Sequence, residues 1–171
     1  TPPRSRTPSN AGTLPEDTAM PTSDLQPLRA ILQQARRRYL TVRPHGFELN
    51  PGERLRPALE VRILSFGSAR TLYQNRKPLC RSLDAIRPTT AKEHRTCAEC
   101  ALRTRCTSQV RLDLLVDTQP WRLLLAYTSA KNFLLYETQL RQRGIALYEG
   151  LHRMTVINRG SWGELRFARP D

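Results

Sequence analysis

Acidic residues, aromatic residues and long apolar runs are all scarce in this chain. Asp and Glu together number 15 against 28 Lys and Arg, and aromatic residues make up 6% of the sequence. None of the apolar runs comes near the roughly 20 residues that a membrane helix needs. The first residues also lack an apolar run behind a basic start, so no secretory signal is predicted. We therefore expect a soluble, cytoplasmic protein with no membrane partner.

Signatures of catalysis are absent as well. The sequence has no glycine-rich loop of the kind that cradles phosphate, no H-E-x-x-H pair for a catalytic metal and no serine in an elbow pattern. Its acidic residues are scattered, with no local pair of carboxylates such as a metal-dependent nuclease uses. These absences favour a binding protein, and we expect neither catalytic residues nor enzyme activity.

Positive charge is what the chain has in excess. The formal net charge is +13, and arginine supplies most of it, from Arg4 to Arg169. The excess positive charges repel one another in the folded state, and this repulsion is tolerated where a polyanion supplies the opposite charge. Guanidinium groups fork onto phosphate and stack on bases better than ammonium groups do. Nucleic acid is the partner that this charge favours, with an acidic protein or membrane surface as the alternative.

The N-terminal third shows two kinds of composition. Residues 1–22 are rich in Pro, Thr and Ser without an apolar period, so we expect a disordered tail. Residues 23–56 predict an amphipathic helix over 24–39, which could dock on a protein partner, and an irregular connection over 41–56. The apolar stripe of that helix consists of Leu25, Leu28, Ile31, Leu32, Ala35 and Tyr39.

From residue 57 onward the apolar residues mainly alternate with polar ones, which predicts a mainly β domain over residues 57–171. We expect a first strand that begins near Leu59 and breaks at Gly67, with residues 69–74 as its hairpin partner. A second hairpin is expected over residues 110–127, turning at 117–120.

A helix and two strands complete the predicted domain. Thr128 or Ser129 can cap a helix that runs to Arg143, with Gly144 just after its end. The last strands are expected over 151–158 and 163–168. The fold class is therefore α+β and mainly β, with one helix before the strands and one between the late strands. The expected core aromatic residues are Trp121, Tyr127, Phe133 and Phe167.

All the cysteines lie in one basic segment, residues 78–108, at spacings C-x16-C-x2-C-x5-C. Four thiolates suit the tetrahedral preference of zinc, and C-x2-C lets two sulfurs reach one ion from a tight turn. We expect Cys80, Cys97, Cys100 and Cys106 to bind one structural zinc ion with no open coordination position. Disulfides, free cysteines and His94 as a replacement ligand are the alternatives.

Basic and aromatic residues alternate along the predicted strands and turns. A single nucleic-acid strand is held by a positive groove along its backbone and by aromatic rings on which bases stack. Tyr73, beside a basic turn, and Trp162, in a Gly-containing turn, are the favoured stacking residues. The full set of nucleic-acid-binding candidates is Arg62, Phe66, Arg70, Tyr73, Arg76, Lys77, Arg81, Arg122, Lys131, Arg159, Trp162 and Arg166.

The order of hairpin, cysteine segment, hairpin, helix and final strands resembles an OB-fold with an inserted zinc ribbon. Bacteriophage single-stranded DNA-binding proteins and the zinc-bearing domain of the large subunit of eukaryotic replication protein A have this organisation. The resemblance covers residues 59–167. It is carried by Leu79-Cys80-Arg81-Ser82-Leu83-Asp84, by the group from Cys97-Ala98-Glu99-Cys100 to Cys106, and by the stretch from Pro120 through Thr128-Ser129-Ala130-Lys131-Asn132-Phe133.

This resemblance implies a five- to six-stranded OB-like barrel and sequence-tolerant binding of single-stranded DNA, with RNA also open. It implies a role in DNA replication, recombination or a mobile-element complex, in the nucleoid of a bacterium or a phage-infected cell. Two other classes stay open. One is a non-catalytic subunit of a transposition or CRISPR-type assembly. The other is a zinc-ribbon nuclease, which would cleave single strands with magnesium or manganese.

Overall fold

The computed structural model describes residues 38–89 and 96–170. The expected disordered tail over residues 1–22, most of the expected helix over 24–39 and His94 lie outside these residues. Tyr39 forms an isolated β-bridge with Arg122, which lies in the strand β6 (Gln119–Leu125). The helix expected to reach Tyr39 therefore does not include it.

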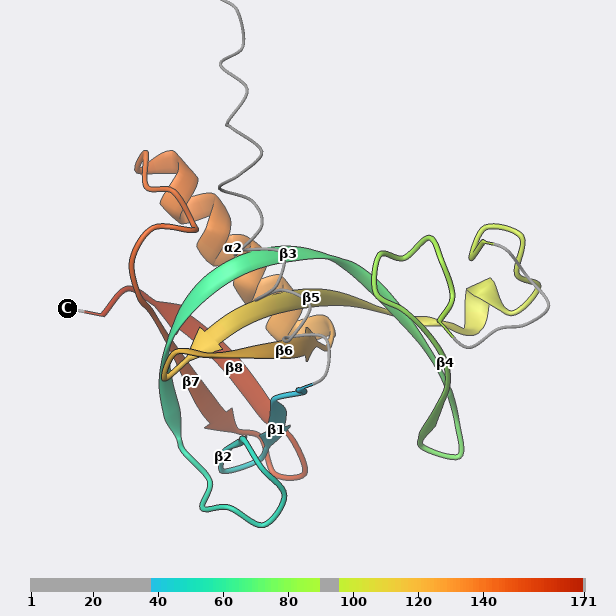
Figure 1. Ribbon diagram of the computed structural model, residues 1–171, viewed down its shortest axis with the longest axis horizontal. Coiled ribbons are helices and arrows are strands. Elements are labelled where there is room, and N and C mark those ends of the chain that lie inside the picture. Colours follow the sequence, from blue (N-terminus) through green and yellow to red (C-terminus); the bar gives the residue numbers. More distant parts are fainter. Residues whose placement is uncertain (1–37, 90–95, 171) are drawn as a thin grey trace, which may run out of the picture.

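Antiparallel strands are the main secondary structure of the described chain (Figure 1). Five strands pair in the order β6-β5-β3-β7-β8, and β4 joins the same sheet through β3. This arrangement, with one α-helix, confirms the mainly β, α+β class. The elements are β1 Thr41–Arg43, β2 Gly46–Glu48, β3 Ala58–Gln74, β4 Lys77–Ser82, the short 3-10 helix η2 Arg103–Arg105, β5 Thr107–Val116, β6 Gln119–Leu125, α2 Tyr127–Gln142, β7 His152–Asn158 and β8 Gly163–Ala168.

The connection expected to be irregular contains a small hairpin. Thr41–Arg43 pairs with Gly46–Glu48 as a separate two-stranded sheet. The prediction was wrong here because each strand has only three residues, too few to show an alternating pattern. Phe47, at the centre of β2, is fully buried and anchors this hairpin to the core.

The long strand β3 differs most from the prediction. It passes straight through Gly67, where the sequence predicted a break and a turn. Its first part pairs with β7 and β5, and its last part, from Arg70 to Gln74, pairs with β4. The end of β3, β4 and the start of β5 project from the body of the molecule as an arm that includes Cys80 and carries the rest of the cysteine segment, residues 83–89 and 96–106 (Figure 1).

A bulge between Ile63 and Ser65 interrupts the pairing of β3 with β5. One extra residue on a strand reverses which face the following side chains occupy. Ile63 lies in the core before the bulge, and Phe66 is turned toward the core after it. Ser65 and Gly67 consequently lie opposite Asp113 and Arg111 on the outer face of the sheet.

The hairpin of β5 and β6 confirms the expected pairing, with a tighter turn. Val116 pairs with Gln119, so only Asp117 and Thr118 form the turn. Both have positive φ angles, 47° and 67°, as the central residues of a type I′ turn do. This turn matches the right-handed twist of the paired strands.

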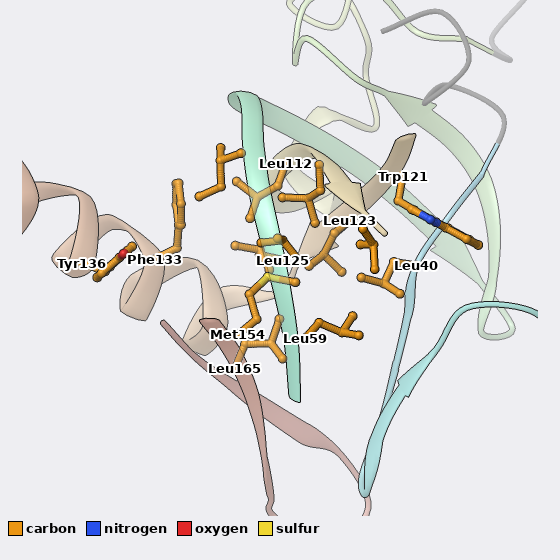
Figure 2. Packing of buried hydrophobic residues seen from close by; sticks show 14 of the residues in the cluster. Leu40, Leu59, Leu112, Trp121, Leu123, Leu125, Phe133, Tyr136, Met154 and Leu165 are labelled. Carbon is orange, nitrogen blue, oxygen red and sulfur yellow. The ribbon is translucent and has the colours of Figure 1, made fainter. Parts of the chain in front are cut away.

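The core lies between the curved sheet, α2 and the segment before β1 (Figure 2). Leu112, Leu123, Leu125, Met154 and Leu165 are each at most 1% exposed. Trp121 and Phe133 are buried, and Phe167 packs against the same cluster, as the sequence predicted. Tyr127 was expected there too, but it is 79% exposed at the start of α2.

Helix α2 starts earlier than the capping residues suggested. Its N-cap is Ala126, which has no capping side chain, in place of Thr128 or Ser129. The Ser129 hydroxyl is buried and instead accepts a hydrogen bond from the Leu165 amide at 3.1 Å. Gly144 follows the helix with a φ of 70°, as predicted for the residue after a helix end. No helix in residues 38–89 and 96–170 is long and apolar enough to cross a membrane.

The chain before β1 lies along the free edge of β6. The Leu40 amide donates to the Arg122 carbonyl at 2.9 Å, and the Arg122 amide donates to the Arg38 carbonyl at 2.8 Å. At the other edge of the sheet, a Cβ on Gly163 would lie 2.5 Å from the carbonyl oxygen of Arg43. Residues 38–43 therefore lie beside both β6 and β8.

Candidate nucleic-acid interface

Three partly exposed aromatic rings line one cavity of about 440 Å³ beside β6 and β8. Tyr39 comes from the segment before β1, Tyr73 from the arm and Trp162 from the turn between β7 and β8. Their exposed fractions are 36%, 42% and 44%. We call this cavity the aromatic pocket. The two residues favoured for stacking from the sequence, Tyr73 and Trp162, thus meet in one site.

Arg81 connects the aromatic pocket to its neighbour. Its guanidinium carbon lies 5.0 Å from the centre of the Tyr39 ring, a cation–π distance. Both residues also line a second cavity of about 280 Å³, with Leu83 and Thr89 further along it. The Arg81 carbonyl accepts hydrogen bonds from the Thr89 amide and hydroxyl, which fixes the cysteine segment against β4.

A third cavity of about 470 Å³ continues from the second, because both are lined by Leu83 and Thr89. Ionic side chains dominate it, and we call it the arginine pocket: its charged members are Asp84, Arg87, Arg111, Asp113 and Arg122. The three cavities follow one another through shared lining residues from Trp162 to Arg111. Together they form the groove.

Asp113 organises the inner wall of the arginine pocket. Its Oδ1 accepts a hydrogen bond from Arg122 Nε at 2.8 Å and lies 2.7 Å from Arg122 Nη2. Its Oδ2 accepts a hydrogen bond from the Ser65 hydroxyl at 2.7 Å and lies 3.3 Å from Arg111 Nε. Asp113 and Arg122 are each only 2% exposed. One buried carboxylate thereby orients two guanidinium groups.

The cysteine residues approach one another beside the arm. Burial raises the pKa of the Cys106 thiol, and the charges of Cys100, Cys80 and Cys97 raise it further. A hydrogen bond of 2.6 Å from the Cys97 amide to the Ile86 carbonyl connects two turns of the segment. In the described residues, no three or more His, Cys, Asp or Glu side chains are arranged as a metal-binding group.

Two predicted contact residues are engaged inside the molecule. Phe66 packs edge-on against Phe133, with ring centres 5.3 Å apart, so the bulge removes it from the surface. Arg122 is buried in its ion pair with Asp113. The sequence did not reveal either position, because the bulge and the ion pair both depend on the pairing of β3, β5 and β6.

Other predicted residues lie away from the groove cavities. Arg159 and Arg166 pair with Glu164, at 2.9 and 2.7 Å, and the Arg159 hydrogen bond lowers the pKa of that carboxyl. Lys131 lines a separate cavity on α2 with exposed Leu134 and Leu135.

The remaining basic candidates divide between β3 and the arm. Arg62 is exposed on the body of β3, opposite Leu115. Arg70 lies close enough for its charge to act on Cys106. Arg76 and Lys77 are exposed at the turn between β3 and β4. The structure therefore brings Arg81, Tyr73 and Trp162 together, with the buried Arg122 at the far end of the groove, and leaves these four outside its cavities.

Sequence reasoning missed Tyr39, Arg87 and Arg111 as groove residues. Tyr39 was assigned to the apolar stripe of a helix, although three consecutive arginines before it were a signal for a nucleic-acid contact. Arg111 lies on an alternating strand opposite Gly67, and the small residue beside a basic one leaves room for its side chain. No local pattern distinguished Arg87 from the other basic residues of the cysteine segment.

No protein-family model, curated protein or solved structure matches this chain.

Proposed function

We propose that this protein binds single-stranded DNA in the groove, without strong preference for sequence. The observation that carries the proposal is the aromatic pocket, where Tyr39, Tyr73 and Trp162 are all partly exposed around one cavity with Arg81. Exposed aromatic rings in a cavity can stack on unpaired bases, which contributes roughly 1–3 kcal/mol per base. In a duplex, the faces of the bases are already stacked on one another and cannot reach these rings.

Charge supports the same proposal. The chain has a net charge of +13, and the groove continues from the aromatic rings toward Arg87 and Arg111. A single strand presents bases, which can stack on the aromatic rings, and backbone phosphates, which can contact the arginines. Such binding tolerates many sequences, because every base has an aromatic face and every nucleotide has a phosphate.

An OB-like barrel is the fold that we propose for the body of the molecule. β3 pairs with both β5 and β7, so the strands before and after α2 are held on its two sides. Residues 38–43 lie beside both sheet edges, β6 and β8, and would fill the remaining seam. This arrangement resembles the partly open barrel that other single-strand binders use.

We further propose that the cysteine segment holds one structural zinc ion through Cys80, Cys97, Cys100 and Cys106. The donor set fits, because four sulfurs suit tetrahedral zinc and the charges of the other three thiols raise the pKa of Cys106. Zinc would supply the stability that this segment lacks, since none of its described residues belongs to the hydrophobic core.

Fluorescence anisotropy tests the proposed function with labelled single-stranded and duplex DNA of equal length. Wild-type protein should prefer the single strand, and Trp162→Ala should weaken that binding by roughly fivefold or more, since one stacking ring is lost. Tyr148→Ala is the control, because Tyr148 is 53% exposed and lies outside the groove cavities. Equal affinity for both DNA forms, or equal effects of the two substitutions, would refute the proposal.

A subunit of a larger nucleoprotein assembly is the second candidate. It is favoured by the apolar surface on α2, where Tyr127, Leu134 and Leu135 are exposed around one cavity. In that case the isolated chain should show little preference for single strands, and full affinity should need other subunits. Incubation of single strands with magnesium or manganese tests the nuclease alternative, which predicts cleavage.

A further inference from the structure

The arginine pocket carries more positive than negative charge. Arg87, Arg111 and Arg122 line it against Asp84 and Asp113. Asp84 is occupied locally: its Oδ1 accepts hydrogen bonds from the amides of Ile86 at 2.8 Å and Arg87 at 2.7 Å. These bonds fix the turn that carries Arg87 and lower the pKa of Asp84, so this carboxylate stays charged and the pocket keeps a formal excess of one positive charge, three arginines against two aspartates.

The guanidinium groups of this pocket keep unused donors. The Arg87 side chain is exposed and forms no hydrogen bond or ion pair with any residue in the described part of the chain. Arg111 donates to the Leu83 carbonyl from Nη1 at 2.6 Å, and its Nη2 faces Gly67, where a Cβ would be only 3.4 Å away. At the floor of the pocket, Arg122 Nη1 is buried and has no partner among those same residues.

We propose that the arginine pocket is a phosphate site, which receives one backbone phosphodiester of the strand bound in the groove. This inference rests on the proposed function, because the strand has to lie in the groove for its phosphate to arrive there. Arg87 and Arg111 contact the phosphate oxygens, and buried Arg122, although paired with Asp113, offers its unpartnered Nη1 donor at the floor of the pocket. Planar guanidinium groups suit phosphate, and Arg111 and Arg122, which other contacts hold in place, lose little side-chain freedom on binding.

The position of the pocket favours a strand phosphate over an unrelated anion. Leu83 and Thr89 join it to the middle cavity, and Tyr39 and Arg81 join that cavity to the aromatic pocket. A strand whose bases stack at Trp162 and Tyr73 would pass these shared lining residues on its way to Arg87. An isolated small anion would need no such connection.

The first test compares Arg87→Ala with Arg141→Ala in the full chain. Arg141 is exposed in the last turn of α2 and lines none of the three groove cavities, so it controls for loss of one charge. Arg87→Ala should weaken single-strand binding by about 3- to 10-fold in 0.1 M salt. It should also make the slope of log affinity against log salt shallower by about 0.7, the value for one phosphate contact on a single strand. Arg141→Ala should change neither.

The second test follows the Nε–H resonances of Arg111 and Arg122 by NMR while inorganic phosphate is added. Specific shifts in wild type that Arg87→Ala reduces would support the site without using DNA. If wild type binds single strands but Arg87→Ala and Arg141→Ala have the same affinity and the same salt slope, the assignment to a strand phosphate is overturned. If phosphate shifts these resonances but no strand binds, the proposed function fails and the site belongs to a free anion. No shift and no change in salt slope would overturn the site itself.

Discussion

Asp113 shows how much of this site depends on a single buried residue. It lies on the outer face of the sheet yet is only 2% exposed, because Ser65, Arg111 and Arg122 surround its carboxylate. Arg122 shares this low exposure and has no other ion-pair partner in residues 38–89 and 96–170. Removing the negative charge would leave a buried guanidinium without compensation.

We predict that Asp113→Asn lowers the free energy of unfolding by about 3–5 kcal/mol, the cost of breaking a buried ion pair. Asp117→Asn is the matched control, because its pair with Arg56 at 2.6 Å is exposed and should contribute less than about 1 kcal/mol. Urea unfolding of both variants measures the difference. Similar losses of unfolding free energy from the two substitutions would show that the buried ion pair contributes no more to stability than the exposed one.

His152 gives the fold a predictable response to acid. Its Nε2 lies 2.7 Å from the Leu147 carbonyl, which can only accept, so Nε2 carries the proton and Nδ1 accepts from the Tyr136 hydroxyl at 2.7 Å. Burial lowers the pKa of His152 from 6.5, and the nearby charge of Arg169 lowers it further. The folded protein therefore binds this proton less readily than the unfolded chain does.

The contribution of His152 to the free energy of unfolding should accordingly be complete above pH 6.5. It should decrease as the pH drops from 6.5 to the lowered pKa of His152. The expected slope is at most about 1.4 kcal/mol per pH unit. Glu48 and Glu164, whose pKa values are lowered from 4.5, titrate below the two pH values used in the measurement, 7.5 and 5.5. Urea unfolding at pH 7.5 and 5.5 measures the slope, which His152→Gln should abolish. A slope that survives the substitution would assign it to other groups.

At the scale of elements, we expect the loss of one thiol to unfold the cysteine segment while the sheet stays folded. Cys97 and Cys100 lie in turns of the segment, whereas the core is built from the sheet and α2. A metal-supported segment loses its fold with its metal, and a hydrophobic core does not. The two parts can therefore be distinguished experimentally.

We predict that wild-type protein contains one zinc ion per chain and that Cys100→Ser contains none. Amide exchange should then accelerate in residues 96–106 and stay slow in the hairpin of β5 and β6. Atomic absorption and hydrogen exchange with mass spectrometry measure the two effects. Thr107→Ser, beside Cys106, should change neither. A metal-free wild-type protein with the same slow exchange in residues 96–106 would refute a structural zinc.

Elements with strong local signals were predictable from the sequence. The hairpin of β5 and β6 alternates cleanly and has a polar turn, and α2 ends before Gly144 as expected. The extent of β3 was not predictable, because Gly67 indicates a break when only its neighbours in the sequence are considered. In the structure, pairing with β5 on one side keeps Gly67 within the strand. The aromatic pocket was predictable only in part: Tyr73 and Trp162 were favoured individually, but the order of strands brings them together.

At the scale of the whole molecule, residues from position 39 onward line the three groove cavities in the described part of the chain. The first 37 residues contain five basic and three acidic residues, so they contribute +2 to the net charge of +13. Most of the electrostatic attraction for a polyanion therefore belongs to the rest of the chain.

We predict that a protein beginning at Arg38 keeps its preference for single strands and loses less than tenfold in affinity, since only +2 of charge is removed. Anisotropy at two salt concentrations, beside the full chain, measures this. Full-length protein in which Arg36 and Arg37 are changed to Ala is the control for charge alone. Loss of the preference after truncation would mean that the first 37 residues form part of the binding surface.

The continuity of β3 also has a mechanical consequence. This one strand runs from the body of the sheet into the arm, with partners on β7, β5 and β4 along its length. Tension directed along β3 loads many backbone hydrogen bonds at the same time, whereas tension across the sheet opens them one by one. The molecule should thus resist stretching along β3 and yield more readily across it.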